Sequence, residues 1–240
     1  MKAFSITDVG EKRMVNQDYV FCEVNPIGNL PNLFIVADGM GGHNAGDYAS
    51  RFCVEFFTEH IRNSSTAAPI ALMEEAIAAT NESLYEKSKE QADLEGMGTT
   101  FVASTICGNT LYVANIGDSR LYVISDEMVQ ITEDHSLVQA MVKTGELNKD
   151  EVKTHPNKNI ITRALGTSKT AQPDFFEVEL KEGDIVLMCS DGLTNMLSDD
   201  TIEKIIRENA DDLQAAGGIL VRQANENGGK DNITVIIVKV

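Results

Sequence analysis

The stretch LFIVADG, residues 33–39, has five consecutive apolar residues followed by Asp38 and Gly39. An apolar run of this length, bounded by an aspartate and a glycine, is typical of a short β-strand. Similar runs lie on both sides of it and dominate both ends of the chain. We expect strands at residues 4–9, 19–24, 33–37, 101–107, 111–116, 121–124, 175–180, 185–189 and 233–240.

Four other segments have the spacing of helices. Over residues 47–62 the apolar residues recur at steps of three and four, so they share one helical face. A second helix is expected to begin near Pro69, a residue suited to the first helical turn. Two more helices are predicted after Ser198 and Asp211, whose side chains we expect to act as N-caps.

The connections between the strands indicate the fold class. The gap at residues 107–110 predicts a hairpin and the gap at 116–121 a second tight reversal, because neither can hold a crossover helix. The helices come in pairs between groups of strands, without a strand–helix–strand alternation. We therefore predict an α+β layered domain with mainly antiparallel sheets, rather than a doubly wound fold.

Length and composition predict one folded domain. A chain of 240 residues with 42% hydrophobic residues can bury a large core, which excludes disorder. We predict a single domain over residues 1–240. Residues 133–172 are the one long region without clear strands, and we interpret them as a small inserted subdomain.

The net charge and the lack of targeting signals in this sequence limit the classes of binding partner that we expect. The 37 acidic and 20 basic residues give a net charge of −17, which repels phosphate backbones and anionic membranes. The sequence has neither a leader-like start nor an apolar run of membrane-spanning length, so we expect a cytoplasmic protein without nucleic-acid or membrane partners. The four cysteines form no C-x-x-C pair, which favours free thiols and excludes zinc ribbons and disulfide scaffolds.

Five aspartates lie at the ends of predicted strands. Asp18 and Asp231 precede strands, whereas Asp38, Asp118 and Asp191 follow them. In antiparallel pairs the end of one strand lies beside the start of the next, so all five are expected at one rim of the sheets. Aspartate is common in turns, and this explanation suffices for any one position taken alone. Five such positions together favour a carboxylate cluster.

A carboxylate cluster requires cations. Two ionised carboxylates about 5 Å apart repel by about 3 kcal/mol at an effective dielectric near 20, and a domain stable by about 5–15 kcal/mol cannot tolerate several such pairs. Oxygen ligands without a neighbouring histidine or cysteine select Mg²⁺ or Mn²⁺ over Zn²⁺. Two ions that share a bridging carboxylate would activate a water molecule for attack on phosphorus.

Two segments beside these acids add candidate ligands. The glycine-rich turn at residues 38–43 leaves the carbonyl oxygen of Gly39 free to bind a metal, and it is not a P-loop because no Gly-Lys-Ser/Thr follows. Arg13, five residues before Asp18, offers a forked guanidinium for bidentate binding of a phosphate. The alternative that Arg13 pairs with a surface acid remains open.

The order and spacing of these residues resemble the PPM (type 2C) metal-dependent serine/threonine protein phosphatases in their compact bacterial form. The resemblance covers the whole chain and implies a four-layer α-β-β-α sandwich of two antiparallel sheets flanked by helix pairs. It also implies hydrolysis of phosphoserine and phosphothreonine by a hydroxide that bridges two Mg²⁺ or Mn²⁺ ions, without a phosphoenzyme. The matching stretches are residues 13–18, 38–43, 96–100, 117–120, 134–136, 161–166, 190–193 and 231–234.

The same resemblance implies a role for each site residue. Asp38 bridges the two ions, Gly39 adds its carbonyl oxygen, and Asp191 and Asp231 complete the shell of the first ion.

For the outer residues, the resemblance implies that Asp18 supports the second ion through bound water. Asp118, with Asp191, is similar to the site of a third, weaker ion in bacterial members. Arg13 resembles the phosphate-binding arginine, and residues 133–172 resemble the mobile flap beside the substrate groove.

One position departs from the eukaryotic pattern. Eukaryotic members have a histidine, proposed as the general acid, where this chain has Met40, whose thioether cannot donate a proton. His43 and His155 are the candidates for replacing it. A structural role explains each of them more simply, so neither is assigned a catalytic function.

The leading hypothesis is a monomeric protein phosphatase that reverses a bacterial serine/threonine kinase. The first rival is a non-catalytic binding module of the same fold, but such relatives lose metal-binding aspartates and all five remain here. The second rival is another two-metal enzyme, such as a nuclease. A net charge of −17 opposes the basic groove that a nuclease needs.

Overall fold

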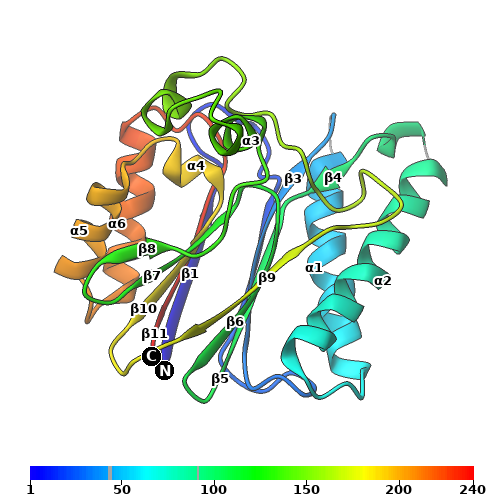
Figure 1. Ribbon diagram of the computed structural model, residues 1–240, viewed down its shortest axis with the longest axis horizontal. Helices are drawn as coiled ribbons and strands as arrows, with labels where there is room; N and C mark the ends of the chain where they lie inside the picture. The colour runs from blue at the N-terminus through cyan, green and yellow to red at the C-terminus, as the bar shows by residue number, and fades with distance from the viewer. Residues whose placement is uncertain (43–44, 91) are drawn as a thin grey trace.

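The computed structural model describes residues 1–42, 45–90 and 92–240. It has four layers, with two β-sheets face to face and helices on both outer sides (Figure 1). Every strand pair within the described residues is antiparallel. The predicted α+β sandwich of antiparallel sheets is thus confirmed.

The first sheet contains both ends of the chain, because its outer strand β1 pairs along its full length with the last strand, β11. Its order is β1 (Lys2–Asp8), β11 (Ile233–Lys239), β10 (Ile185–Cys189), β7 (Arg120–Ile124) and β8 (Met128–Gln130). The second sheet has the order β2 (Asp18–Glu23), β3 (Leu33–Met40), β5 (Phe101–Cys107), β6 (Thr110–Ile116) and β9 (Asp174–Glu179), with β4 (Gly98–Thr99) beside β3.

Each sheet has its own helical layer. The long helices α1 (Ala45–Asn63) and α2 (Pro69–Glu90) cover the second sheet, and α4 (Asp191–Thr194), α5 (Asp199–Glu208) and α6 (Leu213–Glu226) cover the first (Figure 1). The turn η1 (Ala92–Leu94) follows α2. In α5, Ser198 is the predicted N-cap and accepts a hydrogen bond from the backbone of Thr201.

The N-cap prediction for the last helix is wrong by one residue. Asp212, not Asp211, caps α6, and its side chain accepts a hydrogen bond from the backbone N–H of Ala215. The carboxylate of Asp211 does not cap the helix; it accepts a 2.8 Å hydrogen bond from the ammonium group of Lys239 at the end of β11. Sequence position alone could not separate two adjacent aspartates.

The central strands β3, β5, β10 and β11 are buried on both faces, which explains their uninterrupted apolar runs. In β3, Leu33 and Ile35 pack against the helices α1 and α2, whereas Phe34 and Val36 pack against the other sheet. The side chains of a strand alternate between its faces, so Asp38 continues the row that faces the other sheet. An acidic side chain is thereby placed at one end of the inter-sheet core.

The predicted hairpin at residues 107–110 is present, with Cys107 paired to Thr110 across the turn. The predicted reversal at 116–121 is wrong, because β6 belongs to the second sheet and β7 to the first. Gly117 has φ +115°, and a Cβ there would lie 2.5 Å from Cβ of Thr100. A very short link can change sheets because the two layers already lie face to face.

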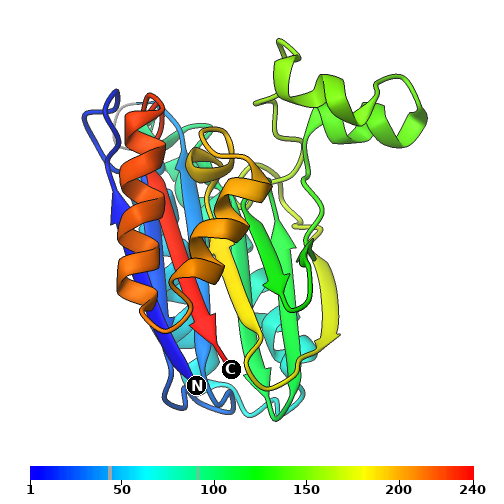
Figure 2. The same ribbon diagram turned by 90° about the vertical axis from the view of Figure 1, so that its left-hand side faces the viewer.

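The region that we interpreted as an insertion stands apart from the sandwich. Residues 133–172 contain α3 (Leu137–Thr144) and the 3-10 turn η2 (Lys149–Thr154) but, as far as the chain is described, no β-strand. Figure 2 shows the segment with α3 projecting above the sheets. The chain then returns, and Leu165 forms an isolated β-bridge with Thr99. Among the described helices, none is long and apolar enough to cross a membrane.

Candidate active site

The site begins where β2 and β3 place two aspartates opposite each other. Asp18 pairs with Asp38 in the antiparallel register, so the two side chains lie on the same face. Oδ2 of Asp18 accepts hydrogen bonds from the hydroxyl groups of Ser190 and Thr234, both at 2.7 Å. Ser190 follows β10 and Thr234 lies in β11. Asp18 therefore joins the two sheets at this rim.

The other three aspartates are brought to the same rim. Asp118 lies in the link between the sheets, Asp191 is the first residue of α4, and Asp231 precedes β11. The negative charges of Asp18, Asp118, Asp191 and Asp231 all raise the pKa of Asp38. Coulomb interactions weaken with distance, so the five carboxylates predicted from the strand ends lie in the same region of the structure.

Burial is the main cause of the perturbed acidity in this cluster. It raises the pKa of Asp18 to about 7, of Asp118 to about 8 and of Asp191 to about 6. For Asp38, burial together with the neighbouring carboxylates raises the pKa well above its ordinary value. Without compensating positive charge, the cluster holds protons at neutral pH.

Several buried oxygen atoms at this rim have no hydrogen-bond partner among the described residues. Within residues 1–42, 45–90 and 92–240, five buried side-chain oxygens lack a hydrogen-bond partner, and three of these are Oδ1 atoms of Asp18, Asp118 and Asp191. A buried polar atom without a partner costs about 1–3 kcal/mol. Three such carboxylate oxygens at one rim fit the oxygen ligands that Mg²⁺ and Mn²⁺ prefer.

The second oxygen of Asp191 is held by its own helix. Oδ2 of Asp191 accepts a 2.8 Å hydrogen bond from the side-chain amide of Asn195, whose oxygen accepts a 3.2 Å bond from the ammonium group of Lys158. Lys158 lies in the 133–172 region. Together with Asp118, these residues border a hollow of about 60 Å³. The projecting region is thus linked to the carboxylate cluster.

Arg13 and Asp231 currently bind each other. Nη2 of Arg13 lies 2.7 Å from Oδ2 of Asp231, and Oδ1 of Asp231 accepts a hydrogen bond from the backbone N–H of Asn232. The pairing of Arg13 with an acid, left open by the sequence, is therefore what the structure shows. In the described part of the chain, no three acidic, imidazole or thiol side chains are drawn together as a ready-made metal site.

Gly39 is required by close packing. A Cβ at this position would overlap the carbonyl oxygen of Gly46 in α1, and the N–H of Gly39 donates to the carbonyl oxygen of Gln17 at 3.0 Å. The preceding residue is equally fixed, because the N–H of Asp38 donates to Oγ1 of Thr100 at 2.9 Å. Close packing of α1 on β3 holds the Asp38 backbone in place.

The histidines differ in their relation to the cluster. His43 lies outside the described residues, and Nδ1 of His155 accepts a hydrogen bond from the backbone of Asn157 within the projecting region. The buried His135 was given no role by the sequence. Its Nδ1 accepts from the N–H of Gly117 at 3.1 Å, so Nε2 carries the proton and donates to Asp174. His135 thereby supports the link that carries Asp118.

Sequence reasoning missed the residues that orient the carboxylates. Ser190 directly precedes Asp191, and Thr234 lies three residues after Asp231. Their contacts with Asp18 join segments that are far apart in sequence. Asn195 had a detectable signal, because it follows Asp191 at the four-residue spacing of helix neighbours. That signal was not used because the short helix α4 was not predicted.

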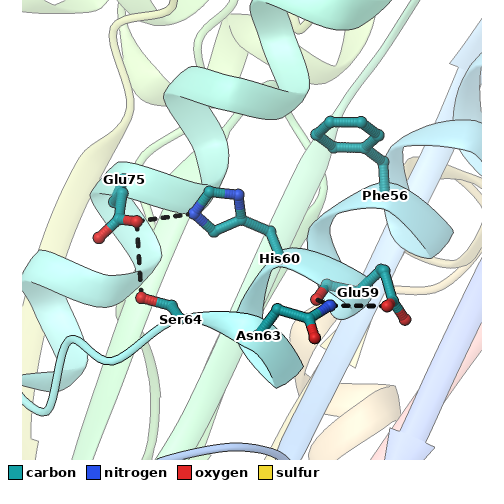
Figure 3. A pocket seen from close by; sticks show the side chains of 6 residues that line it. All are labelled: Phe56, Glu59, His60, Asn63, Ser64 and Glu75. Carbon is teal, nitrogen blue, oxygen red and sulfur yellow. Dashed lines mark hydrogen bonds and ion pairs between the residues drawn. The ribbon is translucent and has the colours of Figure 1, made fainter.

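A second hollow lies between α1 and α2 (Figure 3). It has a volume of about 330 Å³ and is lined by Phe56, Glu59, His60, Asn63, Ser64 and Glu75. His60 and Glu75 form a 2.9 Å hydrogen bond across it. His60 lies 14 residues along α1 from Gly46, roughly 20 Å along the helix axis. This hollow is therefore separate from the carboxylate rim.

A model of the protein phosphatase 2C family matches residues 10–225. The chain belongs to this family.

Relatives of similar length support this assignment. The serine/threonine phosphatase stp of Listeria monocytogenes is 39% identical over 238 residues, which cover 97% of this chain and 93% of the relative. The solved structure of the S. agalactiae serine/threonine phosphatase has a TM-score of 0.92 at 37% identity and covers 100% of this chain and 99% of its own. A structure of the catalytic domain of the phosphatase PstP with two manganese ions has a TM-score of 0.86 at 32% identity, covering 99% and 97%.

Proposed function

We propose that the rim around Asp38 is the hydrolytic site of this serine/threonine protein phosphatase. The observation that carries the proposal is the set of buried, partnerless oxygens of Asp18, Asp118 and Asp191 at the end of the inter-sheet core. If the rim had only a structural role, these unpaired oxygens would lower the stability of the fold without benefit. Unpaired oxygens are expected where a fold keeps them available for cations.

We assign the binding of the divalent ions to this chain's own oxygens. Asp38, the carbonyl oxygen of Gly39, Asp191 and Asp231 would hold the two core ions. When bound, the ions supply charge compensation and the activation of the attacking water.

Two further carboxylates extend this set. We propose that Asp18, which Ser190 and Thr234 fix through its other oxygen, supports the second ion. We propose that Asp118 and Asp191 hold a third ion, because both leave a buried oxygen without a partner beside the same small hollow.

Arg13 binds the phosphate of the substrate in this proposal. Its guanidinium is half exposed and already at the rim through its bond to Asp231. A phosphate dianion can take over this guanidinium in a bidentate geometry. Exchange of partners would also free the carboxylate of Asp231 for a cation. The pair therefore keeps both groups in position before substrate and metal arrive.

The substrates are phosphoproteins, and we infer a cognate serine/threonine kinase that produces them. We also propose a monomer that acts in the cytoplasm. All four cysteines are free thiols, which supports a reducing compartment. The flap role of residues 133–172 is supported by the bond between Lys158 and Asn195.

An assay with a phosphothreonine peptide tests the proposed function. We expect phosphate release in Mn²⁺ or Mg²⁺ and its loss after EDTA treatment, with recovery when metal is restored. Asp184→Asn, a change at the opposite end of the sandwich, is the matched control and should keep the activity. A protein that binds the peptide but releases no phosphate at any metal concentration would be a binding module instead.

A further inference from the structure

An exposed apolar tip stands directly beside Arg13. The side chain of Met14 is 95% exposed, and those of Val15 and Val9 are 42% and 36% exposed. These three residues belong to one loop between β1 and β2. Large apolar side chains held in water mark contact surfaces when they cluster.

The loop is built to hold this tip in place. The buried amide of Asn232 donates to the carbonyl oxygens of both Val9 and Val15, at 2.9 and 3.0 Å, and so ties together the two ends of the loop. Its oxygen accepts a 2.8 Å bond from the N–H of Gln17. On the other side, the N–H groups of Glu11 and Lys12 donate to the carbonyl oxygen of Gly229. The exposure of Met14 is therefore a property of an ordered loop.

The hydrogen bonds of Asn232 also connect the apolar tip to the rim that carries Asp231. Asn232 directly follows Asp231, and Asp231 holds Arg13 at 2.7 Å. In Figure 2 the dark blue loop stands at the top left of the sandwich, at the same end as the projecting α3 segment. A chain bound at this end would meet the loop and the carboxylates together.

We propose that Met14, with Val15, contacts a large apolar side chain of the substrate close to the phosphorylated residue, and so selects phosphosites with apolar neighbours. This inference rests on the proposed function, because it takes the phosphate to lie on Arg13. Adjacent residues of a chain are 3.8 Å apart at Cα, so a phosphate on Arg13 brings its neighbours within reach of Met14.

The chemistry of the tip favours this occupant. Methionine is flexible and polarizable, and it packs well against apolar side chains of different shapes. The net charge of −17 repels additional acidic residues beside the phosphate. Because the backbone of the loop is already held by hydrogen bonds, a contact with it requires little further ordering of the main chain.

A peptide series tests this inference. Phosphothreonine peptides carry one leucine, moved through the positions on either side of the phosphothreonine, or serine in its place. For the wild-type enzyme we expect kcat/KM to rise by about five- to tenfold at one or two leucine positions, the effect of burying part of one apolar side chain. In Met14→Gln, which keeps the length of the side chain, this preference should fall to about one.

The controls distinguish a failure of this inference from a failure of the proposed function. Val129→Gln changes another exposed apolar residue, which lies in β8 and is 52% exposed, and should keep the wild-type preference. A wild-type enzyme without leucine preference, or a preference retained in Met14→Gln, would refute the role of Met14 while leaving the phosphatase activity intact. A change in oligomeric state in Met14→Gln, measured by light scattering, would assign the tip to a contact between copies instead. Failure to hydrolyse any peptide would refute the proposed function.

Discussion

The two ends of strand β3 differ in how their polar groups are paired. At its start, Asn32 is 1% exposed, and its amide donates to the carbonyl oxygen of Ile106 and accepts from the N–H of Ile106, both at 2.8 Å. Near its end, Asp38 lies among carboxylates that leave buried oxygens unpaired. At one end of the sandwich the protein itself supplies partners for the buried polar groups, whereas at the other end these groups require ligands.

Strand β10 shows the same contrast. Asp184, just before the strand, is buried, and its carboxylate accepts a 2.8 Å hydrogen bond from the N–H of Lys181. Asp191, just after the strand, keeps Oδ1 without a partner. The two ends contain similar residue types, so residue type alone does not mark a functional site. The presence or absence of hydrogen-bond partners does.

The largest expected effect follows from replacing Asp38 by asparagine. Phosphatase activity should fall by about a thousandfold or more, because several kcal/mol of transition-state stabilisation depend on the bound ions. The metal-free variant should have a free energy of unfolding about 1–3 kcal/mol higher than wild type, because the wild-type Asp38 must bind a proton on folding at neutral pH and asparagine need not. Aryl phosphate hydrolysis and urea denaturation in EDTA measure the two quantities. Full activity would remove Asp38 from the mechanism.

Asn32→Ala should have the opposite pattern. It leaves the buried N–H and carbonyl groups of Ile106 without partners, and we expect the free energy of unfolding to fall by about 2–4 kcal/mol. The turnover number of the folded protein should remain at the wild-type level. If Asn32→Ala were stable and Asp38→Asn unstable, the contrast between the two ends would be wrong.

Arg13→Ala should produce a smaller change, confined to substrate binding. The KM for a phosphopeptide should rise by about tenfold, with a smaller decrease in kcat, if Arg13 binds phosphate equally in the ground and transition states. Arg207→Ala is the matched control, because Arg207 pairs with Glu203 on the exposed face of α5. An unchanged KM in Arg13→Ala would refute the proposed contact.

The pH dependence of stability provides a test that needs neither metal nor substrate. Burial raises the pKa of Asp18 to about 7 from 3.8, so the proton bound in the folded state favours folding at low pH. This contribution is lost as the pH rises from about 4 through 7. The Tm of the EDTA-treated protein should therefore decrease across this range, and less so in Asp18→Asn. Equal slopes for the two proteins in thermal scans would contradict the assignment.

The sequence predicted the fold where local patterns dominate. The apolar runs located the main strands, and the turn at residues 107–110 was identified because a two-residue loop has a strong local signature. The link after Ile116 was assigned wrongly because its length is the same whether the chain returns to its own sheet or crosses to the facing one. The short helices α3 and α4 lack enough turns to show a period.

The sequence also predicted which carboxylates gather, but not how they are held. Asp38 and Asp191 were identified because each directly follows a predicted strand, which is a feature of the linear sequence. The bonds from Ser190 and Thr234 to Asp18, and the pairing of Arg13 with Asp231, join parts of the chain about 200 residues apart. Such contacts depend on the packing of two sheets, which no local pattern contains.

The pairing of β1 with β11 has a consequence for synthesis. Lys2 lies opposite Lys239, so β1 leaves the ribosome long before β11 and obtains this neighbour only when β11 has emerged. Thr234, which fixes Asp18, arrives in the same final segment. A nascent chain that stops before β11 therefore lacks a finished cluster, and dephosphorylation begins only after β11 has been translated.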